Sequence, residues 1–250
     1  MLPELITSSY GKKYRDEIAV ISLTSWKARI NTVSKTIYNL FTVCPGFHIC
    51  LVLSEDEFPQ KEAELPKHLI MMANANMFEI LWVKRNWKSF KKILFTMEKY
   101  RTLPIISADD DCIYKYNYAA ELLYHLTPNT KTCVTYWCNK YKRNNIYNTS
   151  GYATAFSPDY FNRGVYLLNE EILQFHEDDM LYVALRYVFN IRGCVCLNRP
   201  MEDVASTHSE IQPLHDLYKN RSKEERDETI TQMIGIVSKS LQQFVSVTTL

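Results

Sequence analysis

Three consecutive aspartates, Asp109, Asp110 and Asp111, are the residues of this sequence whose types and spacing best suit chemistry. They follow a short apolar run that begins at Leu103. Extended backbone alternates its side chains, so Asp109 and Asp111 are expected on one face and Asp110 on the other. Two carboxylates on one face suit a hard divalent cation whose other ligands are water and a diphosphate. Because like charges repel, we also expect a positive group nearby; a solvated acidic turn is the alternative.

A second acidic group, Glu177-Asp178-Asp179, opens a predicted helix. A carboxylate there can accept a proton from an attacking hydroxyl, whereas plain capping of the positive helix end is the alternative. The stretch 84–92 has the opposite character, because it carries five lysines and arginines. Acidic and basic blocks in one chain favour a site that binds both an anion and its metal.

Composition limits the class of protein. The chain has 250 residues, of which 46% are hydrophobic and 23% charged, as in a soluble globular domain. A net charge of +1 gives no support for nucleic-acid binding. The amino end lacks a signal-peptide pattern, and no apolar run reaches the roughly 20 residues of a membrane span, which favours a cytoplasmic protein.

Seven cysteines are expected to be reduced, packed thiols. Two pairs are closely spaced, Cys133-x4-Cys138 and Cys194-x-Cys196. Their spacings miss the usual C-x2-C pattern of zinc sites, so we do not expect zinc there.

The first half of the chain alternates predicted strands with predicted helices. Strands are expected over 17–24, 47–53, 78–83 and 103–108, and helices over 28–41 and 89–100. Residues 54–57 are expected to cap a further short helix. This alternation predicts an α/β fold with a mostly parallel sheet and helices on both faces. Ligands of such sheets bind beyond the carboxyl ends of the strands. One rim is therefore expected to hold Thr24-Ser25, Ser54-Glu55, the 84–86 segment and the aspartates.

The second half is predicted to hold helices over 118–126, 166–175 and 177–189, strands over 131–137, 151–156 and 195–197, and a mobile polar loop over 139–150. The amphipathic helix 222–244 closes the chain. We therefore expect a domain over 1–220 and an appended helix over 221–250. Packing on the domain is its first expected use, a homodimer seam the second and a membrane-surface anchor the third.

Four segments in this order resemble the GT-A glycosyltransferases, which act on nucleotide sugars. They are Val20–Trp26 with Arg29, Leu51–Pro59, Ser89–Lys92 and the aspartates. The strings Ser-Leu-Thr-Ser and Asp-Asp-Asp-x-x-Tyr look like those of bacterial surface-glycan enzymes of the lipopolysaccharide or capsule type. The resemblance covers about residues 17–197 and implies a GT-A (Rossmann-like) sheet and a hexosyltransferase-type activity in polysaccharide biosynthesis.

The resemblance also implies roles for individual residues. Asp109 and Asp111 match the pair that binds Mn or Mg, with His208 as a third ligand and His215 as its rival. The nucleotide-sugar donor would contact Thr24, Arg29, Glu55, Lys92 and Asp110. For Arg29 the alternative is a helix-surface arginine, for Glu55 a helix cap, and Lys88 and Lys91 are expected on a solvated face.

Asp178 is the expected base of an inverting transfer, and Asp179 is the second choice. Aromatic residues that could stack on an acceptor sugar bracket the polar stretch: Tyr136, Trp137, Tyr141, Tyr147 and Tyr152. The segment 148–153 departs from the glycine-rich stretch expected before the acceptor site. The acceptor would be a glycan or a lipid-linked glycan, reached by transient contact with the inner membrane.

Two other functions stay open. A nucleotidyltransferase also uses paired carboxylates and a metal, but it should carry a Gly-rich, basic phosphate loop near its start, and 22–29 contains no glycine. A module that binds sugar nucleotides without cleaving them is the non-enzymatic alternative.

Overall fold

The computed structural model describes residues 5–7, 18–127, 130–141, 146–149, 153–161, 163–175, 177–197, 205–206 and 221–248. At 5–7, 139–141, 146–149, 205–206 and 247–248 it describes the backbone alone.

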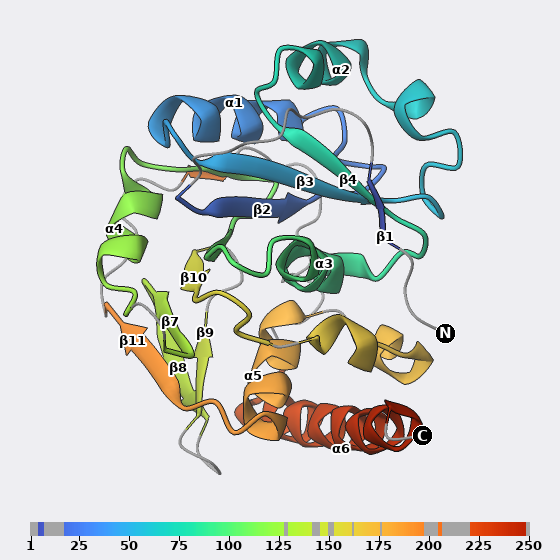
Figure 1. The fold of residues 1–250 in the computed structure, drawn as a ribbon, viewed down its shortest axis with the longest axis vertical. Helices are drawn as coiled ribbons and strands as arrows, with labels where there is room; N and C mark the ends of the chain where they lie inside the picture. Colours follow the sequence, from blue (N-terminus) through green and yellow to red (C-terminus); the bar gives the residue numbers. More distant parts are fainter. Residues whose placement is uncertain are drawn as a thin grey trace.

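An eight-stranded mixed sheet forms the centre of the molecule (Figure 1). In spatial order its strands are β1 (Leu5–Thr7), β4 (Glu79–Val83), β3 (His48–Ser54), β2 (Val20–Thr24), β5 (Ile105–Ser107), β10 (Thr154–Phe156), β7 (Thr132–Thr135) and β11 (Gly193–Cys196). Neighbours from β4 to β5 are parallel, as are β7 and β11. The pairings of β1 with β4 and of β10 with β5 and β7 are antiparallel. The predicted fold class, a mostly parallel α/β sheet, is confirmed.

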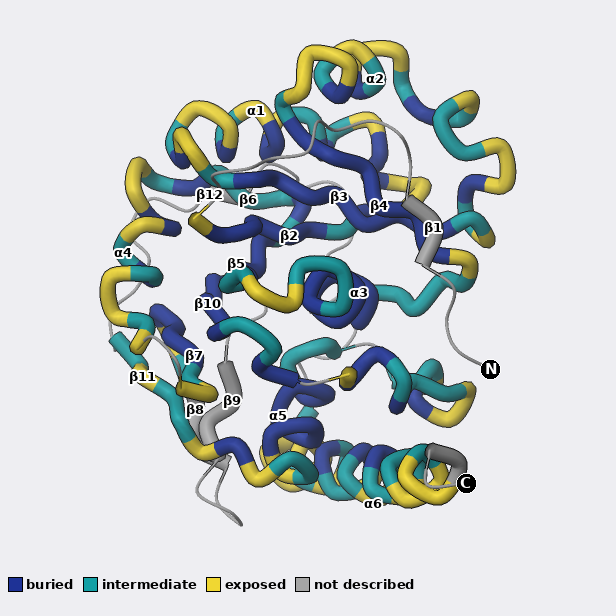
Figure 2. The backbone as a smooth tube through the Cα atoms, in the orientation of Figure 1, coloured by how far each residue is buried: buried dark blue, intermediate teal, exposed yellow. Residues whose placement is uncertain are grey.

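Helices cover both faces of this sheet. One apolar core lies under α1 (Val33–Val43), α2 (Lys67–Asn74) and α4 (Tyr118–Tyr124). The other lies under α3 (Lys91–Lys99), α5 (Asp178–Val188) and α6 (Lys223–Thr248). The strands between them, such as β3, are buried along their whole length, which explains their unbroken apolar runs. Figure 2 shows α3 as dark as the strands, because it lies between the sheet and the α5 layer.

The carboxyl-terminal helix packs on α5, as the sequence predicts. Ile230, Met233 and Val237 on its inner stripe are buried in the same core as α3 and α5. A division of the chain at residue 220 stays a prediction. None of the helices within the described ranges combines the length and apolar character needed to cross a membrane.

Three elements differ from the sequence prediction. The predicted loop at 139–150 contains an antiparallel hairpin, β8 (Cys138–Tyr141) with β9 (Ile146–Thr149). Its strands lack the apolar alternation that identifies a half-buried strand. The predicted helix at 166–175 is two 3-10 segments, η3 (Gly164–Leu167) and η4 (Glu170–Gln174). Asn169 separates them and caps η4 with its side chain. Ser54 ends β3, residues 55–57 form a turn, and the 3-10 segment η1 (Lys61–Glu64) follows in place of the short helix that 54–57 were expected to cap.

The order of the strands determines where a ligand can bind. From β2 the chain passes through α1 to β3 and through α2 to β4, and then α3 returns it to β5 on the other side of β2. The order therefore reverses between β2 and β5, and such switch points form ligand crevices at the carboxyl ends of the strands. Ser25 follows β2 there, and the aspartates follow β5. A small ladder of β6 (Cys112–Ile113) and β12 (Ala205–Ser206) comes directly after the aspartates.

Candidate functional site

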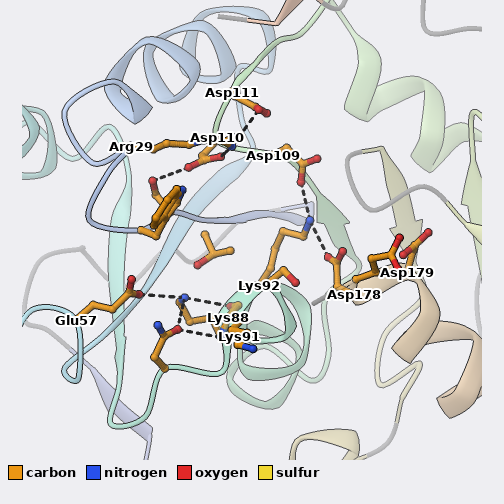
Figure 3. A pocket seen from close by; sticks show the side chains of 16 residues that line it. Arg29, Glu57, Lys88, Lys91, Lys92, Asp109, Asp110, Asp111, Asp178 and Asp179 are labelled. Atoms are coloured by element: carbon orange, nitrogen blue, oxygen red, sulfur yellow. Dashed lines mark hydrogen bonds and ion pairs between the residues drawn. The ribbon is translucent and has the colours of Figure 1, made fainter. Parts of the chain in front are cut away.

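A cavity of about 580 Å³ lies at this switch point (Figure 3). It brings together the ends of β2 and β5, the start of α3 and the start of α5. Sixteen residues line it: Thr24, Ser25, Trp26, Arg29, Glu57, Asn86, Lys88, Ser89, Lys91, Lys92, Asp109, Asp110, Asp111, Glu177, Asp178 and Asp179.

The outer two aspartates lie close enough together to share a cation. Ligand atoms of Asp109, Asp111 and Cys112 all lie within 4.8 Å of one another. The sequence prediction treated the triplet as extended backbone. In the structure β5 ends at Ser107 and a turn follows, so the triplet is not part of a strand. Carboxylate oxygens at this spacing fit a hard divalent cation such as Mg²⁺ or Mn²⁺, so the residues present suit the expected metal.

Asp110 is the buried member of the triplet. Its carboxylate accepts hydrogen bonds from Ser25 Oγ at 2.6 Å and from Arg29 Nη1 at 2.8 Å. Burial raises the pKa of Asp110, while Arg29 and Ser25 act in the opposite direction. The same Arg29 nitrogen lies 3.0 Å from Asp111 Oδ2. Arg29 is therefore not a helix-surface arginine, since its side chain is 8% exposed and clamps two of the three carboxylates.

Lys92 joins the aspartates to α5. Its ammonium lies 2.7 Å from Asp109 Oδ1 and 2.9 Å from Asp178 Oδ2, and only 3% of its side chain is exposed (Figure 3). Burial lowers the pKa of Lys92, but the two carboxylates outweigh burial and raise it overall. The expected positive group beside the triplet is therefore present twice, as Arg29 and as Lys92.

The start of α5 places three acidic residues at the cavity: the N-cap residue Glu177, and Asp178 and Asp179 of the first turn. Asp178 also accepts a hydrogen bond of 3.1 Å from the hydroxyl of Tyr182, one turn further along the helix. Burial raises the pKa of Glu177, and the negative charge of Asp179 is the second largest cause of the rise. These carboxylates lie at the positive end of the helix dipole.

The prediction that Lys88 and Lys91 lie on a solvated face is wrong. Lys91 is 2% exposed and its amine donates to Asn86 Oδ1 at 3.2 Å and to the Lys88 carbonyl at 3.1 Å. Burial lowers the pKa of Lys91 to about 8 although Glu57 lies 3.6 Å away. Lys88 is half-buried and donates to the carbonyl of Leu173. The physical reason is that η3 packs on α3, and α5 packs on the 3-10 segment η2 (Lys88–Phe90), where the sequence suggested solvent.

Of the two other residues predicted to contact the nucleotide-sugar donor, one lines the cavity and the other does not. Thr24 lines the cavity, although its hydroxyl donates to the Val52 carbonyl at 2.7 Å. Glu55 is not among the described residues that line the cavity, and it pairs with Lys61 at 3.0 Å. Glu57 takes its place at the cavity wall.

Sequence reasoning gave no individual role to five lining residues, Ser25, Trp26, Glu57, Asn86 and Ser89, although Ser25 and Asn86 were expected on the rim. Ser25 and Trp26 had a usable signal, because they directly follow the strand that ends at Thr24. Trp26 remains 45% exposed, so its ring is available to a ligand. Asn86 had the signal of its place after the strand over 78–83, whereas Ser89 had no signal of its own.

Several predicted residues fall outside the described ranges. His208, its rival His215 and the aromatic residues Tyr147 and Tyr152 cannot be placed in the fold, apart from the backbone of Tyr147 in β9. Of the remaining aromatic residues, Tyr136 is wholly buried and donates to Glu121, as a packed tyrosine does, and Trp137 is half-exposed.

Comparison with known proteins gives no assignment by sequence, since no family model and no curated protein matches the chain. Solved structures show low similarity. The glycosyltransferase GlyE of Streptococcus pneumoniae TIGR4 aligns with a TM-score of 0.46 and 12% identity over 93% of this chain. This chain spans only 65% of GlyE.

Two further structures belong to different classes of enzyme. The mannosyltransferase PcManGT of Pyrobaculum calidifontis, solved with GDP-Man and Mn²⁺, aligns with a TM-score of 0.46 and 10% identity over 98% of this chain and 79% of that one. A 4-diphosphocytidyl-2C-methyl-D-erythritol synthase aligns with a TM-score of 0.47 and 10% identity over 81% and 97% of the two chains. Similarity of this degree assigns no activity.

Proposed function

We propose that this protein is a metal-dependent, inverting glycosyltransferase that moves a sugar from a nucleotide-diphosphate donor to a glycan acceptor. The observation that carries the proposal is the meeting of Asp109 and Asp111 with Asp178 in one cavity, with Lys92 between them. A transfer of this kind needs a group that neutralises the departing diphosphate and a base for the attacking hydroxyl. The two ends of the cavity offer one group for each task.

Asp109 and Asp111 would hold Mn²⁺ or Mg²⁺, with His208 as a further proposed ligand. When bound, the cation would neutralise the negative charge that develops on the leaving diphosphate. Lys92 supplies a second positive charge at the same place, and its ammonium is already directed at the carboxylates that would face the diphosphate. Asp110 and Arg29 do not need to touch the donor, because their mutual contacts hold Asp111 in place.

The nucleoside end of the donor would lie against Thr24, Ser25 and Trp26, where the exposed indole offers a stacking surface. Of the two glutamates after β3, Glu57 is better placed than Glu55 for a contact with the donor, because Glu57 lines the cavity and Glu55 pairs with Lys61.

Asp178 would take the proton from the acceptor hydroxyl as that oxygen attacks the anomeric carbon on the face opposite the leaving group. Its contacts with Lys92 and Tyr182 hold the carboxylate in one orientation. Asp179 is the second candidate for this role. A hexose donor and a surface polysaccharide or lipid-linked acceptor, reached at the inner membrane face, complete the proposal.

The test is release of nucleotide diphosphate from a panel of UDP- and GDP-sugars, with Mn²⁺ and with a chelator. We expect release that depends on Mn²⁺ and is lost in Asp109→Asn and Asp111→Asn, whereas Glu224→Gln on the exposed face of α6 leaves it unchanged. Release that chelation does not affect, or full release by both aspartate variants, would contradict the proposal.

The same assay separates the alternatives. A nucleotidyltransferase would release pyrophosphate from a nucleoside triphosphate and a sugar phosphate, and an inactive module would bind a sugar nucleotide without releasing anything. Among the described residues no glycine lines the cavity, so the backbone loop with which many nucleotide sites hold phosphate is not seen there.

A further inference from the structure

Four of the seven cysteines, far apart in the sequence, meet at one end of the sheet. Cys133 in β7 and Cys194 in β11 are direct partners in a parallel ladder. Cys196 lies two residues further along β11 and so on the same face, and Cys138 opens β8 immediately after β7. The two closely spaced pairs that the sequence offered as an unlikely zinc site are therefore brought together by the fold.

The thiols interact in two pairs. Cys133 is hydrogen-bonded to Cys194, and Cys138 is hydrogen-bonded to Cys196. Cys133 is wholly buried and also accepts a bond of 3.4 Å from the hydroxyl of Tyr160.

The direction of its pKa shift distinguishes Cys133 from Cys138 and Cys194, whose pKa values are raised. Burial alone would raise the pKa of its thiol, but the hydrogen bond with Cys194 and the positive charge of Arg186 outweigh burial and lower the pKa to about 7. The guanidinium of Arg186 acts on Cys194 and Tyr160 as well. A thiol with a lowered pKa, hydrogen-bonded to a second thiol on the neighbouring strand, is the arrangement of a reactive dithiol.

A shared metal does not explain the cluster. Within the part of the chain that the structure describes, Asp109, Asp111 and Cys112 form the only group of three or more possible ligands whose atoms all lie within 4.8 Å of one another. A tetrahedral thiolate site would need closer mutual spacing of its sulfurs than these cysteines have.

We propose that Cys133 and Cys194 form a reversible disulfide when the protein meets a peroxide. The Cys133 thiolate attacks one peroxide oxygen, the O–O bond breaks, and the departing oxygen takes a proton and leaves as water. The sulfenic acid on Cys133 is then attacked by the Cys194 sulfur. The S–O bond breaks, and the oxygen leaves as a second water with the proton of the Cys194 thiol. Two thiols lose two electrons, and one peroxide gains them.

Backbone geometry permits this bond. Neighbouring strands are roughly 4.8 Å apart, which lies within the range of about 4.4 to 6.8 Å between the Cα atoms of a disulfide. In the described sheet β11 pairs with β7 alone, so it is an edge strand that can shift by the small distance required. Cys194 is half-buried, which leaves a small oxidant a short route to the pair.

The experiment treats the full-length, fully reduced protein with a small molar excess of hydrogen peroxide and then blocks remaining thiols with an alkylating reagent. Peptide mapping by mass spectrometry should show Cys133 joined to Cys194 as the first product, and dithiothreitol should reverse it. Hydrogen exchange of the β11 amides should slow in the oxidised protein, because the bond ties the edge strand to β7.

Matched variants make the test specific. Cys194→Ser should lose the product, and Cys196→Ser should keep it. Mapping of the wild-type protein needs no variant, so the proposal stays testable if Cys194→Ser fails to fold. Both thiols still alkylated after peroxide, or Cys138–Cys196 as the first disulfide, would overturn it.

Discussion

Asp110 is the buried carboxylate of the aspartate triplet, and replacing it gives the most specific prediction about the site. Asp110→Asn keeps the shape of the side chain and removes its charge, leaving the Arg29 guanidinium with Asp111 as its charged partner. Removing one partner of a buried ion pair costs about 3 to 5 kcal/mol. Because Asp111 remains 3.0 Å from the same nitrogen, we expect the lower end, about 3 kcal/mol of unfolding free energy.

The assay is urea unfolding at neutral pH, followed by tryptophan fluorescence and by circular dichroism, whose transitions should coincide if unfolding is two-state. Arg29→Met should cost a similar amount, because it leaves Asp110 buried without that partner. The double variant should cost about 2 kcal/mol less than the sum of the two single variants, because it removes both charges and leaves neither buried without its partner. Lys239→Ala in an exposed pair is the control and should leave the transition unchanged.

An Asp110→Asn loss below about 1 kcal/mol, the value of a surface pair, would refute this reasoning. Additive single and double variants would refute it too, because additivity means that Arg29 and Asp110 do not act as a unit.

Three further predictions follow from the lysines and from α5. The pKa of Lys91 is about 8 in the folded protein and about 10.4 in the unfolded chain. Between these pH values the unfolded state binds more protons, so the free energy of unfolding should rise with pH by about 3 kcal/mol. Urea unfolding against pH should show this rise in the wild type and in Lys35→Met, but not in Lys91→Met. Lys92→Met should weaken binding of UDP or GDP at least about tenfold by calorimetry, because a charged hydrogen bond is lost; unchanged affinity would exclude a phosphate contact. Asp178→Asn should lower kcat by about 10²-fold to 10⁴-fold with little change in donor affinity, and full turnover would exclude it as the base.

The first half of the fold could be predicted well from the sequence. Buried parallel strands such as β3 have unbroken apolar runs, and α1 has Val33, Ile37 and Leu40 at helical spacing. These local patterns also placed the aspartates at the rim, because the carboxyl ends of parallel strands share one edge.

Contacts across the chain could not be predicted in the same way. Lys91 and Lys92 are adjacent and chemically alike, yet one meets Asn86 and Glu57 and the other joins Asp109 to Asp178. Burial of a lysine depends on which helix covers it, and that is a property of tertiary packing rather than of spacing.

The central claim is that Asp109 and Asp111 bind a divalent cation together with a diphosphate, and calorimetric titration of Mn²⁺ in the presence of UDP or GDP tests it most directly. We predict that the wild-type protein binds Mn²⁺ with one of the two nucleotides and that Asp109→Asn and Asp111→Asn each lose at least about tenfold in Mn²⁺ affinity. Asp227→Asn in α6 should bind as the wild type does. Equal Mn²⁺ affinity in the wild type and both site variants would contradict the account.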